Sequence, residues 1–126
     1  MIDALFNDPN YLAGKKTLDA IALRQEAIAS NIANLETPGY RRVDLAPSFK
    51  AELEKACATG DAQQIASLKP ALAPDLDAVP GSRDGNTVNL ETEMMNLNQN
   101  TLANAVETQV VSYQLLKLQM AITGKS

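Results

Sequence analysis

The sequence predicts a mainly α-helical protein built around two long helices, one in each terminal part of the 126-residue chain. The composition is 45% hydrophobic but only 4% aromatic, so the core must consist of aliphatic and small side chains, which suits helix-on-helix packing. Apolar residues recur at alternating spacings of three and four in both terminal regions. We therefore expect one structural domain with three segments: residues 1–42, a short irregular or partly helical middle at 43–86, and residues 87–126.

The N-terminal helix is expected to begin near Pro9. Asp8 can accept hydrogen bonds from the first free backbone amides, and proline at the first helical position gives up a donor that has no partner there. Pro38 disfavours a helical conformation at Thr37, so the helix should end near Leu35 or Glu36. Its apolar stripe includes Leu18, Ile21, Ile28 and Ile32.

A turn is predicted directly after this helix, at Thr37–Tyr40. Pro38 followed by Gly39 fits the two central positions of a type II turn, where the second residue needs a positive φ. Asn31 and Asn34 lie in the last turns of the helix, although asparagine is a poor helix former. Two interpretations stay open: solvated amides at a frayed helix end, or amides that satisfy backbone groups at a junction with a neighbouring subunit.

The middle segment is expected to hold a short helix and a long loop. Ser48 could cap a helix that carries Phe49, Leu53 and Cys57 on one face and stops at Gly60. This spacing predicts that Cys57 is a small core residue rather than a nucleophile. Residues 61–69 are expected to add another turn or two of helix, and the prolines and glycines of residues 70–86 predict a loop.

The C-terminal helix is expected to run from Leu90 to Ile122, with Asn89 as its N-cap and with Glu91 and Glu93 near its positive end. It carries two apolar stripes on nearly opposite sides. The first stripe is expected to form an intrachain seam with the N-terminal helix through Leu102, Val106, Tyr113, Leu116 and Met120. The second is expected to form an intersubunit face through Leu90, Met94, Leu97, Val111, Leu115, Leu118 and Ile122.

One partner helix cannot cover both stripes. If covered, the seven apolar residues of the second stripe represent on the order of 10–20 kcal/mol of gross burial free energy. The helix could lie at the centre of a bundle formed by its own chain, or neighbouring molecules could cover it. The chain has few other long helices, which favours neighbouring molecules. We therefore expect frayed ends in the isolated chain that become ordered on assembly.

Several classes of function are disfavoured by composition. The net charge of −4 and the absence of a basic cluster argue against nucleic acid as the partner. The most hydrophobic region is interrupted by polar residues, so no membrane insertion is expected, and the N-terminus lacks the pattern of a cleavable secretory signal. There is no histidine and one cysteine, Cys57, and Glu91 and Glu93 do not share a helical face. We expect no catalytic residues, metal site or cofactor.

Two motifs resemble those of the bacterial flagellar axial proteins, which form the rod and hook. The first is Asn31-Ile32-Ala33-Asn34 followed by Thr37-Pro38-Gly39-Tyr40 at the end of an N-terminal helix. The second, residues 84–88 followed by Glu91 and Glu93 in so short a chain, is similar to the family of proximal rod protein B. The resemblance covers both terminal thirds and leaves roughly residues 43–83 unassigned. It makes Asn31, Asn34, Thr37, Pro38, Gly39 and Tyr40 the candidate interaction motif.

This resemblance implies a structural subunit of the flagellar basal body. In that family the terminal helices pair as a coiled coil in the wall of a tubular rod, which transmits torque and lines the export channel. The expected partners are further copies, other rod proteins, the adaptor at the membrane ring and the type III export gate. The expected location is the periplasmic rod, reached from the cytoplasm without a cleavable signal. The alternative function is a soluble helical adaptor or secretion chaperone that binds partner helices.

Overall fold

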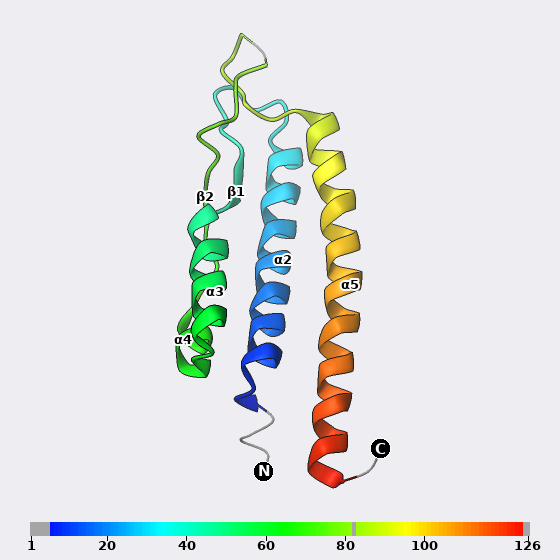
Figure 1. Cartoon of the computed structure of the whole chain (residues 1–126). Helices are drawn as coiled ribbons and strands as arrows, with labels where there is room; N and C mark the ends of the chain where they lie inside the picture. Colours follow the sequence, from blue (N-terminus) through cyan, green and yellow to red (C-terminus); the bar gives the residue numbers. More distant parts are fainter. Residues whose placement is uncertain (1–5, 82, 125–126) are drawn as a thin grey trace.

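The computed structural model describes residues 6–81 and 83–124 and is mainly helical, as the sequence predicts (Figure 1). The two longest elements are α2, with 25 residues, and α5, with 34 residues. Between them in the sequence come a two-stranded sheet and two shorter helices. In chain order the elements are α2 (Pro9–Ala33), β1 (Val43–Leu45), α3 (Pro47–Thr59), α4 (Ala62–Ser67), β2 (Leu72–Pro74) and α5 (Leu90–Thr123).

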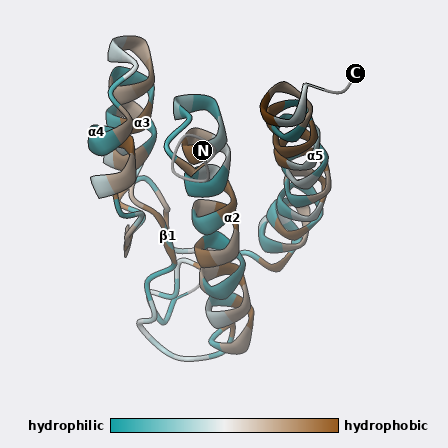
Figure 2. Ribbon diagram, turned by 90° about the horizontal axis from the view of Figure 1, so that it is seen from below, coloured by the Kyte–Doolittle hydropathy of each residue, from teal (hydrophilic) through white to brown (hydrophobic). Residues whose placement is uncertain are grey.

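Helix α2 lies between the other parts of the molecule. In two perpendicular views α5 lies on one side of α2, and α3 and α4 lie on the other (Figures 1 and 2). The two long helices are antiparallel: Asn31, late in α2, donates to Glu93, early in α5, while Gly14 lies against Val111. Among the residues that the structure describes, no other helix lies beside the side of α5 that faces away from α2 (Figure 2).

Local signals set the ends of α2 largely as expected. The Asp8 carboxylate accepts a hydrogen bond of 3.0 Å from the Tyr11 amide, and Pro9 opens the helix. The helix ends at Ala33, slightly earlier than predicted, with Asn34 as its C-cap. The turn that follows is confirmed, because the Tyr40 amide donates to the Thr37 carbonyl at 3.2 Å and Gly39 has a φ of 73°.

The middle segment contains a sheet that the sequence did not indicate. Strands β1 and β2 pair antiparallel, with Val43 opposite Pro74 and Leu45 opposite Leu72. Helix α3 begins at Pro47, so Ser48 is inside the helix rather than at its cap, and Gly60 ends it as predicted. The prediction for Cys57 is wrong, since its side chain is exposed and the neighbouring Ala56 is buried instead.

The hydrophobic core is small and follows α2. Leucine, isoleucine and alanine side chains of α2 meet α3 and α4 on one side and α5 on the other. Ile65 of the short helix α4 is fully buried, as is Ala27 of α2. The buried hydrophobic residues are Tyr11, Ala20, Ala27, Ile28, Phe49, Ala56 and Ile65.

Candidate functional site

The face of α5 that packs on α2 mixes apolar and polar side chains. Asn100 is buried there and donates to the Ile21 carbonyl at 3.0 Å and to the Gln25 side chain at 2.9 Å. Nine residues at helical spacing on this face are buried or half-buried. They are Glu93, Asn96, Leu97, Asn100, Glu107, Val111, Gln114, Leu115 and Leu118.

Gly14 permits a close approach between the two long helices. A Cβ atom placed on this residue would lie only 2.7 Å from Cγ2 of Val111. A valine side chain has few alternative rotamers in a helix, so it cannot easily move away. Gly14 therefore determines how near α5 lies to α2.

The structure places the two apolar stripes of α5 differently from the prediction. The prediction that Leu102, Val106, Tyr113, Leu116 and Met120 pair with α2 is wrong, because these side chains are exposed. Four residues predicted for the intersubunit face are half-buried instead: Leu97, Val111, Leu115 and Leu118. Both stripes are apolar, so hydrophobicity alone cannot orient the helix. Glu93 and Asn100 orient it, because their hydrogen-bond partners lie on the α2 side.

The remaining predicted seam residues lie on α2. Ile28 is buried, and Leu18, Ile21 and Ile32 are half-buried. Of the predicted intersubunit face, Leu90 and Met94 are each 45% exposed and Ile122 is 37% exposed.

We call the exposed apolar residues on the far side of α5 the outer stripe. Leu102 and Tyr113 are 66% and 67% exposed, and Val106 and Leu116 are each 54% exposed. Glu107 is the only charged residue between Met94 and Leu116, and it lies on the α2 side. A long face without charge is unusual on a water-exposed helix and is typical of the central part of protein interfaces. The outer stripe consists of Met95, Leu102, Val106, Tyr113, Leu116 and Met120.

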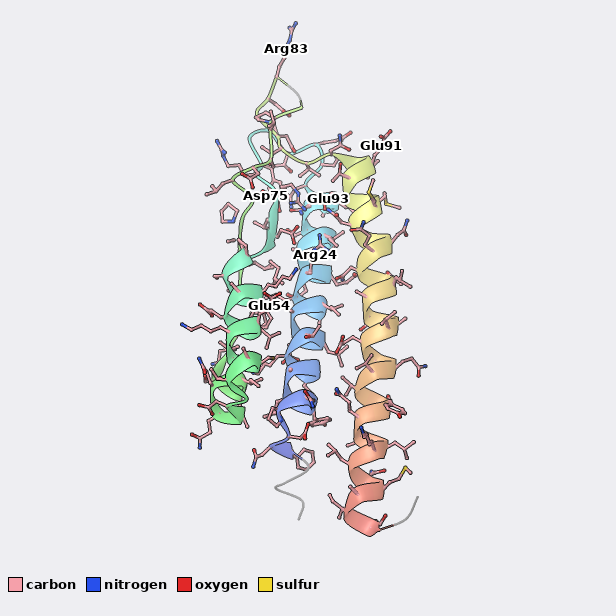
Figure 3. All side chains as sticks on the ribbon, in the orientation of Figure 1. Arg24, Glu54, Asp75, Arg83, Glu91 and Glu93 are labelled. Carbon is pink, nitrogen blue, oxygen red and sulfur yellow. The ribbon has the colours of Figure 1, made fainter. Side chains whose placement is uncertain are left out.

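A buried cluster of charged residues joins the middle segment to both long helices. The Arg42 guanidinium donates to Glu93 at 2.7 Å through Nε and to Asp75 at 2.5 Å through Nη1. Its Nη2 atom donates to Asp44 at 3.2 Å, and Arg24 of α2 donates to the same carboxylate at 3.0 Å. Figure 3 shows Arg24, Asp75 and Glu93 approaching this region from three different segments. We call these five residues the ion-pair cluster.

The ion-pair cluster shifts the pKa values of Arg42 and Asp44 in the directions that favour their charged forms. Burial alone would lower the pKa of Arg42, but its hydrogen bonds to Glu93 and Asp75 raise that pKa above its ordinary value. Burial alone would raise the pKa of Asp44, but the hydrogen bond from Arg24 and the Leu45 amide hold it below the ordinary value. Both groups stay charged at neutral pH.

Asn31 of the sequence motif lies inside the molecule. It is fully buried, its amide donates to the Val43 carbonyl at 2.8 Å, and its side-chain oxygen accepts from the Val43 amide at 2.9 Å. It also donates to Glu93 at 3.3 Å and accepts from the Tyr40 hydroxyl at 3.2 Å. The interpretation as a solvated amide is wrong for Asn31, and its partners belong to its own chain.

The rest of the motif forms the turn beside Asn31. The Asn34 amide donates to the Ser30 carbonyl at 2.8 Å, and the Thr37 hydroxyl donates to the Asn34 side chain at 3.0 Å. Pro38 and Gly39 are exposed. The structure brings these residues together in one turn, and the turn is closed by Asn86, which belongs to the second sequence motif at residues 84–88. The Asn86 amide donates to the carbonyls of Asn34, Leu35 and Thr37 at 2.9, 3.0 and 2.8 Å.

Sequence patterns did not identify the ion-pair cluster. Arg42 belongs to no motif, and Glu93 was noted as a charge near a helix start and as part of the second motif, not as a buried ion-pair partner. Spacing gave no indication that Asp44 and Asp75 would meet, because the pairing of β1 with β2 brings them together. Charged residues beside short strands carry no periodic signal that could have indicated it.

Among the residues described here, no helix combines the length and the apolar character that crossing a membrane requires. The same residues contain no cluster of histidine, cysteine, aspartate and glutamate suited to binding a metal ion.

Comparisons with known proteins agree with this architecture. The family model described as "Flagella basal body rod protein" matches residues 13–41, which cover most of α2 and the turn. Flagellar basal body rod protein FlgB of Yersinia enterocolitica is 36% identical over 115 residues, covering 80% of this chain and 84% of the relative. FlgB of Proteus mirabilis is 30% identical over 138 residues and covers 97% of both chains, and FlgB of Borrelia hermsii is 29% identical over 123 residues, covering 83% of this chain and 89% of the relative. These proteins are structural, and the chain belongs to the FlgB family of flagellar basal body rod proteins.

Proposed function

We propose that the chain is a structural subunit of the proximal rod that assembles through the outer stripe of α5, transmits torque and helps to enclose the export channel. The observation that carries this proposal is the long apolar face that the chain leaves exposed on α5, which carries no charged residue from Met95 to Leu116. Covering its six residues would contribute on the order of 5–10 kcal/mol of gross burial free energy. Because the chain belongs to a family of rod proteins, neighbouring rod subunits are the proteins that would cover this face.

Torque transmission is supported by the shape of the molecule. Helix α5 spans about 51 Å at 1.5 Å per residue, and α2 runs beside it along most of that length. The ion-pair cluster links the middle segment to both helices at one end. Such side-by-side packing would pass a twisting load from one subunit to the next through many contacts.

The same proposal includes the partners and location that the sequence motifs implied. Besides other copies and other rod proteins, these are the adaptor at the membrane ring and the type III export gate. The location is the periplasmic part of the rod. A soluble adaptor or secretion chaperone, the alternative considered from sequence, is less consistent with membership of the rod family.

The test is a charged substitution in the outer stripe. Val106→Asp should leave the free energy of unfolding of the purified protein nearly unchanged, because the side chain is 54% exposed. It should prevent incorporation into basal bodies and abolish motility in a complemented deletion strain, since it would bury an unpaired charge between subunits.

Two further variants make this test specific. Val106→Thr keeps the β-branched shape without a charge and should still be incorporated. Leu115 lies on the α2 side of α5, so Leu115→Asp should lower the stability of the isolated protein, which Val106→Asp should not do. Normal motility with Val106→Asp would contradict the proposal.

A further inference from the structure

The outer stripe of α5 is interrupted by two polar residues, Gln99 and Gln109. Together with them the stripe keeps alternating intervals of four and three residues without a break from Met95 to Met120. This is the spacing with which one helix packs along another in a two-stranded coiled coil. Both glutamines are exposed, and neither side chain forms a hydrogen bond to another residue that the structure describes.

These two glutamines restrict which surface can cover the outer stripe. A wholly apolar partner would bury both amides without hydrogen bonds, which is unfavourable. A matching partner must therefore present polar groups at the positions that face Gln99 and Gln109. A second copy of α5 meets this requirement, because an amide side chain both donates and accepts hydrogen bonds and can pair with another amide.

Antiparallel pairing of two α5 helices brings the glutamines together in one register. Setting Gln99 opposite Gln109 of the second copy also sets Leu102 opposite Val106 at the centre of the contact. A shift by one heptad would set Gln109 opposite Val106, or in the other direction Gln99 opposite Leu102, and would leave amides unpaired. The apolar layers of the matched register are Leu102 with Val106 and Met95 with Tyr113, each formed twice.

The exposed charges of α5 agree with the same register. Glu91 and Lys117 are the only exposed charged residues of α5, all of which the structure describes, and Figure 3 labels Glu91 in its first turn. Neither forms an ion pair with another described residue, although Asp8 lines the same depression as Lys117. The antiparallel register sets Glu91 level with Lys117 of the second copy at both ends of the contact. A parallel pair would set like charges level with each other, which is unfavourable.

We propose that two free molecules pair through their outer stripes, with α5 antiparallel to α5 of the second copy and Gln99 hydrogen-bonded to its Gln109. A contact with two-fold symmetry uses the same surface of both copies and closes on itself, so it does not propagate into a rod. The pair is therefore a state of the free protein, in which the outer stripe is covered until neighbouring rod subunits replace the second copy. Two polar layers weaken such a seam, so the pair dissociates on dilution and the outer stripe becomes accessible. This inference rests on the proposed function and adds a regulation of the same face.

Disulfide cross-linking of concentrated purified protein tests the register. In a Cys57→Ser background, Leu102→Cys and Val106→Cys are oxidised separately and as an equimolar mixture. The mixture should give linked dimers and each variant alone should give few, because the register sets position 102 opposite position 106. Glu52→Cys, on an exposed position of α3, replaces Leu102→Cys in a control mixture that should not link. Linkage of each variant with itself, which a parallel pair would produce, or no linkage in the mixture would overturn the inference.

Charged substitutions at the two glutamines test the same register by the sign of the charge. Gln99→Lys/Gln109→Glu should dimerise at least as well as the wild type, because antiparallel pairing sets opposite charges face to face. Gln99→Lys/Gln109→Lys should weaken dimerisation about tenfold or more, because like charges then meet. Sedimentation velocity over a concentration series measures the dimer, and circular dichroism verifies that both variants are folded. Equal weakening of the two variants would contradict the antiparallel pair.

Incorporation of Val106→Asp into basal bodies separates this inference from the proposed function. If purified protein forms no dimer while Val106→Asp still blocks incorporation, the paired state is wrong and assembly through the outer stripe stands. If the dimer forms in the expected register while Val106→Asp is incorporated normally, the outer stripe serves the free protein alone and the proposed function is wrong.

Discussion

Arg42 connects three segments through a single side chain. Its guanidinium bonds Asp44 in β1, Asp75 directly after β2 and Glu93 in α5. Glu93 is fully buried, so its charge depends on this partner and on the amide of Asn31. An isolated buried carboxylate is very unfavourable, which makes this arginine the residue on which the cluster depends.

Replacing Arg42 by methionine should therefore lower the free energy of unfolding by about 3–5 kcal/mol, because it leaves Glu93 buried without its counter-charge. Urea denaturation of purified protein measures this. Arg41→Met is the matched control, since the neighbouring side chain is exposed and its loss should cost about 0.5 kcal/mol or less. Equal effects for the two variants would contradict the role given to the cluster.

Asp44 predicts a dependence of stability on pH. Its pKa is lower in the folded protein than its ordinary value of 3.8, so it binds protons less readily when folded. The stability it contributes is fully present above about pH 5 and is lost as the pH falls through the folded pKa. Asp44→Asn should therefore be less stable than the wild type at pH 7, and the difference should shrink below about pH 4.

Denaturation curves at a series of pH values check this. Asp77→Asn, in the exposed loop and without an ion pair among the described residues, should track the wild type across the series. A difference between Asp44→Asn and the wild type that stays constant down to the lowest pH would show that Asp44 acts through its shape rather than its charge.

At the scale of elements, the approach of α5 to α2 depends on the absence of a side chain at position 14. Alanine favours a helix by about 1 kcal/mol over glycine, so an exposed glycine replaced by alanine would stabilise α2. At Gly14 the added methyl group would lie 2.7 Å from the Val111 side chain. Overpacking of this kind costs about 1–3 kcal/mol, which exceeds the gain in helix propensity.

Gly14→Ala should consequently give no stabilisation and should lower the free energy of unfolding by up to about 2 kcal/mol. Gly81→Ala is the control, because a Cβ there meets open space and should change stability by about 0.5 kcal/mol or less. Gly14→Ala in combination with Val111→Ala should recover part of the loss. A clear rise in stability with Gly14→Ala alone would show that the helices can move apart freely.

The elements that the sequence predicted correctly are those controlled by neighbouring residues. Asp8, Asn89 and Gly60 act at helix ends through bonds and dihedral angles within a few residues, so spacing reveals them. The turn at Gly39 is predictable for the same reason. Strands β1 and β2 each have three residues, too few for an alternating pattern, and they pair across 26 intervening residues, Ala46 to Ala71.

The orientation of α5 was predicted incorrectly because its decisive residues are polar. Periodicity showed two equivalent apolar stripes and could not choose between them. Asn100 and Glu93 determine which face of α5 packs against α2. Their hydrogen-bond partners are Ile21, Gln25 and Arg42, which lie far away in the sequence. A polar residue in the seam of two helices often fixes their register at some cost in stability, so these residues would have been the signal to follow.

At the scale of the whole molecule, the two long helices differ in how much of their surface the chain itself covers. Helix α2 is packed on two sides, whereas α5 is packed on one and presents the outer stripe to solvent (Figure 2). In a protein that acts alone, such an exposed apolar face would favour aggregation, and charged residues would be expected in its place. In the proposed assembly the same face would be covered by neighbouring subunits, and the ion-pair cluster links the middle segment to both long helices.

Cysteine labelling of the outer stripe tests the central claim most directly. In a Cys57→Ser background, Val106→Cys and Leu115→Cys are each treated with a maleimide reagent, as free protein and within isolated basal bodies. Cysteine at position 106 should react rapidly in the free protein and be protected in basal bodies, while cysteine at position 115 should react slowly in both. Equal labelling at position 106 in the free and assembled states would show that neighbours do not cover the outer stripe.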